Sequence, residues 1–579
     1  MSFGKTIRLT QIQRTVLLME RRTGVVLVTL CCFCSFLLSQ PANETVPAAR
    51  IDSIFADLAK GGPGCSVGVM RAGDLLYERA FGMADLAHEV PLTPTTPVFI
   101  ASSSKQFTAL AVLLLIEEGK LHLSDDVRKL VPEMSHLPAA ITVQQLLQHT
   151  SGLREQWNLF YMSGWRSSDL ETADDLLNLL KMQRGLNHPP GEEFSYNNTG
   201  YSVLALIVER VSGQRFPNFV QSRIFQPLGM TASFVRDDAG AVVPGLAVGY
   251  WGRQAPNLRQ ARVPYSFAGP TGVITNIEDL AKWDRNFYEP KVGSPATIRK
   301  MIQTGQLNDE TDFGYGAGLF IGTYKGHLMV SHAGSDPGYK ADVVRFPDER
   351  LTIAVLCNTF DVFPTPLALR VADLILPDVA SRSVGAPAGA HRTVPAKSAE
   401  FAGLYWNGGK AQTRQFYFED GKLLLDGGGE GKFALAALGD DRFQLMEAPR
   451  QYVFRFYRRG ASLYVEETIE GSPRVTFQKE AKGKPSLAML QRLPGVYYSP
   501  ELDVRWTVEL RDGTLILLRH RLDAAKLKPV FGTVFQAEDF FVLQFSIRGE
   551  PQLDVSTDRA RHVKFVKESR ANCVPNPMR

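Results

Sequence analysis

A serine and a lysine three residues apart stand at the start of an apolar segment and could together perform nucleophilic chemistry. Ser102 and Lys105 lie in PVFIASSSKQFTALAVLLLIEEGKL, residues 97–121. Every residue from Ala109 to Ile116 is apolar, which predicts a helix buried on all sides. The spacing of three puts both side chains on one face of that helix. Burial favours the neutral form of a lysine, and a neutral amine can take the proton of a serine hydroxyl.

The same pair has a plainer interpretation, in which Ser102 caps the helix and Lys105 extends into solvent. Because the Ser-x-x-Lys spacing is common, other parts of the chain must decide between the two interpretations. Three further segments carry polar residues next to apolar runs: HTSGL at 149–153, Tyr-x-Asn at Tyr196 and Asn198, and His-x-Gly at His332 and Gly334.

In their order and setting these motifs resemble those of serine β-lactamases and penicillin-binding proteins. Ser-x-x-Lys combined with Tyr-x-Asn is similar to the group of class C β-lactamases, DD-peptidases, D-aminopeptidases and related esterases. The segment GPTGVITNIEDLAKW, residues 269–283, also looks like that family. The resemblance extends from about residue 51 to residue 379 and implies a serine hydrolase on a β-lactamase-like fold.

The resemblance implies a role for each motif residue. Ser102 is the expected nucleophile and forms an acyl-enzyme, while Lys105 and Tyr196 share the general acid–base work. A phenol titrates near pH ~10, so Tyr196 needs nearby positive charge to act as a base at neutral pH. The main-chain amides of Ser102 and Ser335 are expected to form the oxyanion hole. The residues expected to bind or position the substrate are Asn198, His332, Gly334 and Ser335.

Some of these residues also have structural interpretations. Tyr196 could be a packed aromatic side chain and Asn198 a turn residue. Asn197-Asn198-Thr199 spells a glycosylation sequon, although a turn lining the site explains it better. His149 is expected to form structural hydrogen bonds and to take no part in the chemistry.

His332 departs from the Lys-Thr-Gly motif of the relatives that bind β-lactams best. Lysine is a permanent charge that can hold a substrate carboxylate, whereas imidazole is cationic only in part near neutral pH. Ala333 lacks the threonine hydroxyl of that motif. We therefore expect hydrolysis of amides, peptides or esters in preference to efficient destruction of antibiotics.

Composition and chain ends narrow the classes of function. The chain is 44% hydrophobic and 21% charged, with a net charge of +4. It has no long Lys/Arg run, so nucleic-acid binding is not expected.

Arg21 and Arg22 precede an uncharged run at 24–39, which predicts a signal peptide over residues 1–42, with Met19 as an alternative start. Export to the periplasm or the exterior follows, with no membrane span left after cleavage. An uncleaved segment would instead anchor the protein.

Cysteine is sparse beyond this segment. Only Cys65, Cys357 and Cys573 remain, too few for a disulfide framework or a metal cluster. A bridge between Cys65 and Cys357 is one state in an oxidising compartment, but the sequence favours buried free thiols. Neither a metal nor a cofactor is expected.

The pattern along the chain predicts an α+β protein in several domains. Strand-like segments at both ends of residues 43–380, with helical patterns between them, indicate an antiparallel sheet flanked by helices and an inserted helical region. Residues 381–398 are rich in Ser, Ala, Gly and Pro and predict a linker. Gly403-Leu404-Tyr405 recurs 92 positions later as Gly495-Val496-Tyr497. This repeat predicts two small antiparallel β domains, over 399–480 and 494–570, joined by a linker at 481–493.

The leading hypothesis is an exported serine hydrolase acting on small amides, D-amino-acid-containing peptides or esters. A carboxylesterase on the same fold is the first alternative. The second is a catalytically weak binding protein, whose β domains recognise a cell-wall or peptide ligand. The expected partner is a small-molecule or short-peptide substrate, and the oligomeric state is left open.

Overall fold

The structure, a computed structural model, describes residues 46–568 except 255, 378–395, 428–430, 446–451, 470–473, 482, 484, 539, 548 and 550. The predicted signal peptide, most of the predicted 381–398 linker and Cys573 lie outside the described residues. All described residues belong to one compact unit. In the described part of the chain, no helix is long and apolar enough to cross a membrane.

A six-stranded antiparallel sheet joins the two ends of the first domain, predicted over residues 43–380. Its order is β12 (Phe320–Tyr324), β13 (His327–Asp336), β14 (Tyr339–Phe346), β15 (Leu351–Cys357), β1 (Cys65–Arg71) and β2 (Asp74–Phe81). A tight turn links β1 to β2, and its residues Ala72 and Gly73 have φ values of 51° and 85°. Two positive φ values in succession are what a type I′ hairpin requires. Because β1 pairs with β15, strands from both ends of the domain form one sheet, as predicted.

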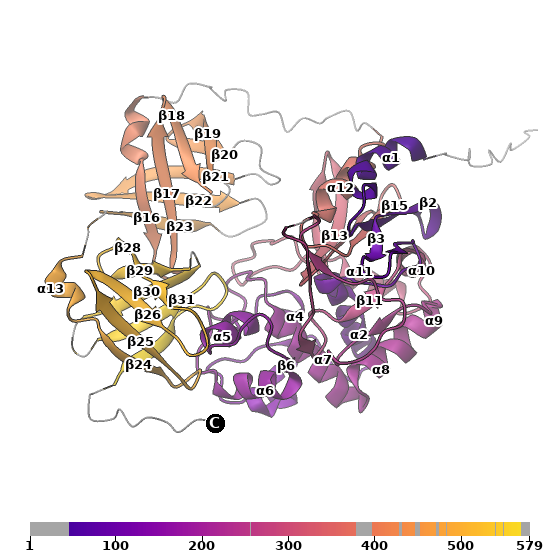
Figure 1. Ribbon diagram of the computed structural model, residues 1–579, viewed down its shortest axis with the longest axis horizontal. Coiled ribbons are helices and arrows are strands. Elements are labelled where there is room, and N and C mark those ends of the chain that lie inside the picture. Colours follow the sequence, from indigo (N-terminus) through magenta and orange to yellow (C-terminus); the bar gives the residue numbers. More distant parts are fainter. Residues whose placement is uncertain are drawn as a thin grey trace, which may run out of the picture. The chain divides into compact units, whose positions relative to one another are not determined.

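Helices cover both faces of this sheet. Helix α1 (Ala48–Phe55) and helix α12 (Pro364–Ala372) lie together on one face, where they share a core with β1, β14 and β15 (Figure 1). Helix α10 (Ile277–Tyr288) packs on β1 and β2 from the other face. The predicted α+β class, with a sheet flanked by helices, is confirmed.

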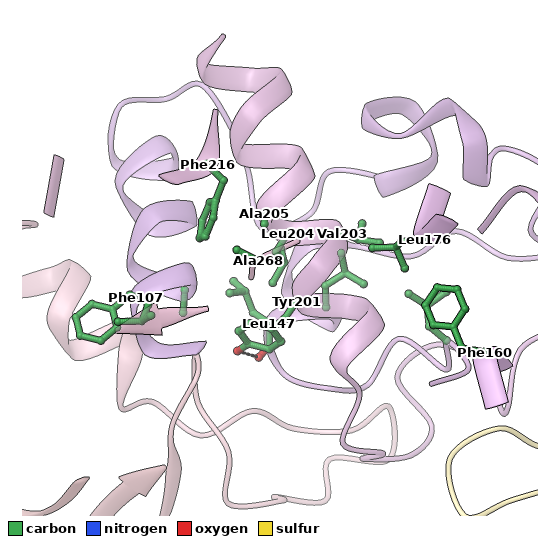
Figure 2. Close-up of a cluster of buried hydrophobic side chains, with 14 of the residues drawn as sticks. Phe107, Leu147, Phe160, Leu176, Tyr201, Val203, Leu204, Ala205, Phe216 and Ala268 are labelled. Carbon is green, nitrogen blue, oxygen red and sulfur yellow. Dashed lines mark hydrogen bonds between the residues drawn. The ribbon is translucent and has the colours of Figure 1, made fainter. Parts of the chain in front are cut away.

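The inserted helical region is built around two buried helices. The 3-10 turn η2 (Ala101–Ser104) leads into α2 (Lys105–Glu117), which is buried from Lys105 to Leu115. Its apolar sequence predicts this burial. Helix α7 (Asn198–Ser212) packs against α2. Figure 2 shows Val203, Leu204 and Ala205 of α7 in the middle of the apolar cluster, between Phe107 and Phe160.

The remaining elements of this domain are short. The helices are η1 (Ala56–Ala59), α3 (Val127–Leu130), η3 (Pro132–Met134), α4 (Val143–Leu147), α5 (Gln156–Met162), α6 (Ala173–Met182), α8 (Phe216–Val220), η4 (Gln221–Phe225), α9 (Gln226–Leu228) and α11 (Pro295–Met301). The strands are β3 (Met83–Asp85), β4 (Val90–Pro91), β5 (Val98–Phe99), β6 (Glu171–Thr172), β7 (Phe234–Val235), β8 (Tyr250–Trp251), β9 (Arg259–Gln260), β10 (Tyr265–Ser266) and β11 (Val273–Thr275).

A disulfide joins Cys65 and Cys357, so the expectation of free thiols was wrong. The two cysteines lie directly opposite each other in the adjacent strands β1 and β15, with their Cα atoms 4.0 Å apart. They are separated by 292 positions in sequence, and only the pairing of the first strand with the last brings them together.

The first repeat forms a closed barrel of eight antiparallel strands, preceded by the 3-10 helix η5 (Ala396–Phe401) (Figure 1). The barrel strands are β16 (Gly403–Asn407), β17 (Gln412–Glu419), β18 (Lys422–Asp426), β19 (Lys432–Gly439), β20 (Arg442–Leu445), β21 (Tyr452–Arg459), β22 (Ser462–Ile469) and β23 (Val475–Glu480).

The second repeat is a nine-stranded antiparallel sheet preceded by α13 (Leu487–Leu490), and its edge strands β27 and β28 are consecutive in the chain. Its strands are β24 (Gly495–Ser499), β25 (Val504–Arg511), β26 (Thr514–Leu518), β27 (Ala525–Lys526), β28 (Lys528–Phe531), β29 (Val534–Ala537), β30 (Phe541–Ser546), β31 (Gln552–Ser556) and β32 (Val563–Lys567). The two antiparallel β domains predicted after the first domain are confirmed.

The repeat is visible in side-chain contacts as well as in strands. The hydroxyl of Tyr405 donates to the carbonyl of Phe401 at 2.9 Å, and that of Tyr497 donates to Leu493 at 2.7 Å. Both the donors and the acceptors are 92 positions apart. Each tyrosine therefore fixes the entry of the chain into its own β domain in the same way.

Candidate active site

Ser102 lies in a tight turn at the point where α2 begins. It is the second residue of η2, and the preceding residue, Ala101, has a φ of 48°. This left-handed conformation is unfavourable for a residue with a Cβ and costs on the order of 1 kcal/mol. The surrounding structure therefore imposes the conformation that presents the Ser102 side chain.

Strand β13 provides much of that constraint. A Cβ added to Gly334 would lie 2.1 Å from the carbonyl oxygen of Ile100 and 2.9 Å from the amide nitrogen of Ser102. One residue along the turn, the hydroxyl of Ser103 donates to the carbonyl of His332 at 2.6 Å. Glycine at position 334 thus permits the close approach of the sheet to the turn that carries Ser102.

Lys105 lies behind Ser102 and is fully buried. Its Nζ is 3.1 Å from the Oγ of Ser102, 2.7 Å from the Oδ1 of Asn198 and 2.9 Å from the carbonyl of Pro270. The last two atoms can only accept hydrogen bonds, so they take two hydrogens of Nζ. The remaining position on this nitrogen faces the serine hydroxyl.

The surroundings of Lys105 hold its pKa near neutrality. Burial lowers the pKa of Lys105 to about 7, although the negative charges of Glu155 and Asp336 oppose that shift. Desolvation has this effect because it disfavours the charged form of an amine. Both the ammonium and the free amine are thus populated near neutral pH. A base with a pKa close to the working pH is well suited to proton transfer.

Glu155 fixes the orientation of Asn198. Its carboxylate accepts from the amide nitrogen of Asn198 at 2.7 Å and from Nδ2 at 3.0 Å. Since a carboxylate only accepts, Nδ2 must face Glu155 and Oδ1 must face Lys105. Asn198 is the first residue of α7, whose N-cap is Asn197, with a side chain that accepts from the amide of Gly200 at 2.8 Å. Asparagine is among the preferred residues at that position.

Tyr196 stands between Lys105 and the open site. The Nζ of Lys105 is 4.9 Å from the centroid of the Tyr196 ring. Burial raises the pKa of Tyr196 well above its ordinary value, and a hydrogen bond with Ser102 opposes this only in part. The ring of His149 packs against the ring of Tyr196, with centroids 4.5 Å apart. The Nδ1 of His149 accepts a hydrogen bond from the amide of Asn197 at 3.1 Å.

His332 is a neutral side chain in this site. Its Nδ1 is 2.7 Å from the carbonyl of Ala333, and its Nε2 is 3.1 Å from the hydroxyl of Tyr315. Because a carbonyl only accepts, Nδ1 carries the proton and Nε2 accepts from the tyrosine. Burial, reinforced by the nearby charge of Lys105, lowers the pKa of His332 to about 3. The position that carries a permanent cation in Lys-Thr-Gly therefore carries none here.

The residues predicted from sequence meet at one open cavity of about 740 Å³. Those that line it are Ser102, Tyr196, Asn198, His332, Gly334 and Ser335. Lys105 is buried directly behind Ser102. Among the described residues, no group of three or more His, Cys, Asp or Glu side chains is arranged to hold a metal ion.

Sequence reasoning missed several residues of the site. Glu155 follows HTSGL by two positions and Asp336 follows Gly334 by two, so both stood next to recognised motifs. Trp157 and Arg559 also line the cavity. Arg559 comes from the second β domain, and no motif in the sequence connects it with the others.

A serine hydroxyl within hydrogen-bond distance of a buried lysine amine, on a sheet-and-helix fold of this topology, defines a serine hydrolase of the Ser-x-x-Lys class. Comparisons with known proteins agree. The family model described as Beta-lactamase matches residues 51–375, more than half of the chain. The chain belongs to the Beta-lactamase family.

Individual relatives extend this result. Penicillin-binding protein 4* of Bacillus subtilis (strain 168) is 32% identical over 302 residues, which cover 49% of this chain and 66% of that protein. A D-aminopeptidase of Cereibacter sphaeroides (strain KD131) is 27% identical over 456 residues, covering 78% of this chain and 82% of the relative. The solved structure of the octameric penicillin-binding protein homologue from Pyrococcus abyssi is 26% identical, with a TM-score of 0.51, and covers 74% of this chain and 98% of that one.

Proposed function

We propose that this chain is an exported serine hydrolase that forms an acyl-enzyme at Ser102 and cleaves small amides, D-amino-acid-containing peptides or esters. One observation carries the proposal: the Nζ of Lys105 lies 3.1 Å from the Oγ of Ser102, and the pKa of Lys105 is about 7. The amine can therefore accept the serine proton near neutral pH without a further base.

The acylation step follows from these positions. The Oγ of Ser102 attacks the substrate carbonyl carbon, and its proton passes to the amine of Lys105. The tetrahedral intermediate collapses as the bond to the leaving group breaks, and the leaving nitrogen or oxygen takes a proton. The Tyr196 hydroxyl can deliver that proton and be restored by Lys105, because it stays protonated at neutral pH.

Deacylation reverses the roles of the groups. A water molecule gives a proton to the amine of Lys105, the base of the acylation step, and adds to the acyl carbonyl. The bond to Ser102 Oγ then breaks as the serine regains a proton. The products are a carboxylic acid and the free enzyme. In both steps the main-chain amides of Ser102 and Ser335 are the proposed donors to the oxyanion, a contribution of ~3 kcal/mol per donor.

Two findings support the choice of substrate class. A relative that aligns with 78% of this chain is a D-aminopeptidase, which supports D-amino-acid amides and peptides as substrates. His332 is neutral, so it cannot hold a β-lactam carboxylate as a lysine would. Efficient antibiotic hydrolysis is accordingly not part of the proposal.

The proposed export rests on the apolar run at residues 24–39, which follows Arg21 and Arg22. This order is the pattern of a secretory signal. The disulfide between Cys65 and Cys357 supports it, because structural disulfides persist mainly in oxidising compartments.

Steady-state assays on three substrate types test the proposed specificity. We expect kcat/KM for p-nitrophenyl esters or D-aminoacyl anilides to exceed that for nitrocefin by at least about tenfold, since the carboxylate contact of Lys-Thr-Gly is missing. A strong preference for nitrocefin would contradict the proposed substrate class.

A further inference from the structure

An arginine of the second β domain reaches the catalytic cavity on a short turn. Arg559 lies between β31 and β32, and its side chain lines the cavity together with Ser102 and Tyr196. The turn is closed by Thr557, whose amide donates to the carbonyl of Ala560 at 2.8 Å and whose hydroxyl accepts from the amide of Ala560 at 2.8 Å. These bonds do not involve the arginine side chain.

The catalytic domain holds this turn through the backbone. The carbonyl of Arg559 accepts from the amide of Glu155 at 3.0 Å and from Nδ2 of Asn187 at 2.8 Å. The amide of Arg561 donates to Oδ1 of Asn187 at 2.7 Å. Since Glu155 also orients Asn198, the turn is bonded directly to the residues that hold the catalytic groups.

The other arginines at this junction are already paired. Arg561 makes two bonds to the carboxylate of Glu193, at 3.1 and 2.8 Å, and Arg154 pairs with Glu501. Both guanidinium groups are buried, with side chains 4% exposed.

Arg559 differs from both of these arginines. Its side chain is 35% exposed, and its ion pair is with the neighbouring Asp558, 64% exposed and 3.4 Å away. An exposed pair of this kind contributes little energy. The Arg559 guanidinium therefore remains available to an anionic group that enters the cavity.

The charge of the cavity favours such an anion. Among the described residues that line it, Arg559 and Lys340 are cationic and Asp336 is acidic. The carboxyl of Asp336 accepts a hydrogen bond from Thr271 and is only 5% exposed. Lys340 holds its ammonium 3.6 Å from the centroid of the Phe363 ring.

We propose that Arg559 selects substrates that carry a carboxylate near the scissile bond. Its planar guanidinium presents two parallel donors that match a carboxylate. It reaches the cavity from the turn between β31 and β32 and not from β13, which carries His332, so the carboxylate that it selects lies at a different position from the one that Lys-Thr-Gly holds in a β-lactam. The second β domain would thus provide the acid-recognising group of the catalytic site. This inference rests on the proposed hydrolase function and narrows its substrates to acidic amides, peptides or esters.

Matched esters test the proposal in the full-length protein. One pair carries the charge on the acyl group: p-nitrophenyl hemisuccinate against its methyl ester. A second pair carries it on the leaving group: 3-acetoxybenzoate against its methyl ester. The quantity measured is the ratio of kcat/KM for the charged ester to that for the neutral ester. The variants are Arg559→Ala, Arg559→Glu, Arg559→Lys and the control Arg511→Ala, which removes the same charge from the exposed β25–β26 turn of the same domain.

We expect Arg559→Ala to lower the ratio roughly tenfold for at least one pair, as loss of a partner to an ionised group does. Arg559→Glu should lower it further, Arg559→Lys should restore part of it, and Arg511→Ala should leave it unchanged. The affected pair identifies the side of the scissile bond that Arg559 contacts. Unchanged ratios for both pairs in Arg559→Ala and Arg559→Glu would overturn the inference.

Ser102→Ala separates this inference from the proposed function. If turnover of the neutral esters requires Ser102 but the kcat/KM ratios are unchanged in the Arg559 variants, only the inference fails. If neither the esters nor D-aminoacyl anilides are turned over, or if turnover survives Ser102→Ala, the proposed function fails and the inference with it.

Discussion

Lys105 is the residue on which the chemistry of this site depends. Its amine is active as a base only when it is unprotonated, and burial lowers its pKa to about 7. The unprotonated fraction increases as the pH rises through that value, so kcat/KM for a neutral ester should rise with a midpoint near pH 7. A pH–rate profile on p-nitrophenyl acetate measures this. A profile without an acid limb between pH 5 and 9 would argue against Lys105 as the base.

Glu155 adjusts both the charge and the geometry around Lys105. Its negative charge raises the Lys105 pKa, so Glu155→Gln should move the acid limb to lower pH. The new amide also places a donor next to Nδ2 of Asn198, so kcat should fall about tenfold or more. Glu171→Gln is the control, because burial raises the pKa of Glu171 to about 8 and its carboxyl is already neutral at pH 7. Equal shifts of the limb in the two variants would contradict this role.

At the residue scale, the sequence predicts those site residues that belong to recognisable local motifs. Ser102, Lys105, Tyr196 and Asn198 were predicted from spacing and resemblance, and the structure brings them together. Glu155 could not be assigned, because a glutamate in a polar loop has the same appearance whether it is exposed or, as here, fully buried. The neutral state of His332 likewise depends on burial that the sequence does not reveal.

The contact of β13 with the η2 turn positions the nucleophile at the element scale. Gly334→Ala should force these elements apart, because the added methyl has backbone atoms 2.1 and 2.9 Å away. Overpacking of this kind costs roughly 1–3 kcal/mol, and acylation of Ser102 should fall with it. Gly322→Ala in β12 is a matched control, since nothing lies within 4 Å of its added Cβ. Thermal unfolding and kcat/KM measure both effects; equal values for the two variants would refute this assignment.

The elements themselves were largely predictable, and their pairings were not. The strand-like segments predicted at both ends of residues 43–380 do form, among them β1 and β15. Their alignment side by side, which places Cys65 opposite Cys357, depends on contacts 292 positions apart in sequence. Periodicity within one segment contains no information about such a partner, which is why the disulfide was not expected.

The second β domain and the helical region share a continuous core at the scale of the whole molecule. The indole nitrogen of Trp506 donates to the carbonyl of Met162 at 3.1 Å, and both residues belong to the same apolar cluster. The buried pair of Arg154 and Glu501 lies at this junction, with side chains 4% and 7% exposed. The repeat predicted the β domains, but it could not show that one of them contributes to the active site.

The junction between the second β domain and the helical region allows a quantitative prediction of folding stability. Glu501→Ala should destabilise the protein by about 3–5 kcal/mol, because it leaves the buried guanidinium of Arg154 without its partner. Glu509 pairs with Arg511 at the surface, where the two side chains are 41% and 57% exposed. Glu509→Ala should therefore cost at most about 1 kcal/mol. Urea unfolding of both variants provides the comparison. A small effect of Glu501→Ala would show that the junction does not stabilise the molecule.

The most direct test of the central claim is to locate the acyl group after brief reaction with p-nitrophenyl acetate and acid quench, by intact-mass and peptide mass spectrometry. We predict one added acetyl group, carried on the peptide that contains Ser102, and none in Ser102→Ala, while the exposed-serine control Ser53→Ala labels as the wild type does. Lys105→Met should slow labelling by a factor on the order of 100 or more. Acetylation at another residue, or equal labelling of Ser102→Ala, would contradict the account.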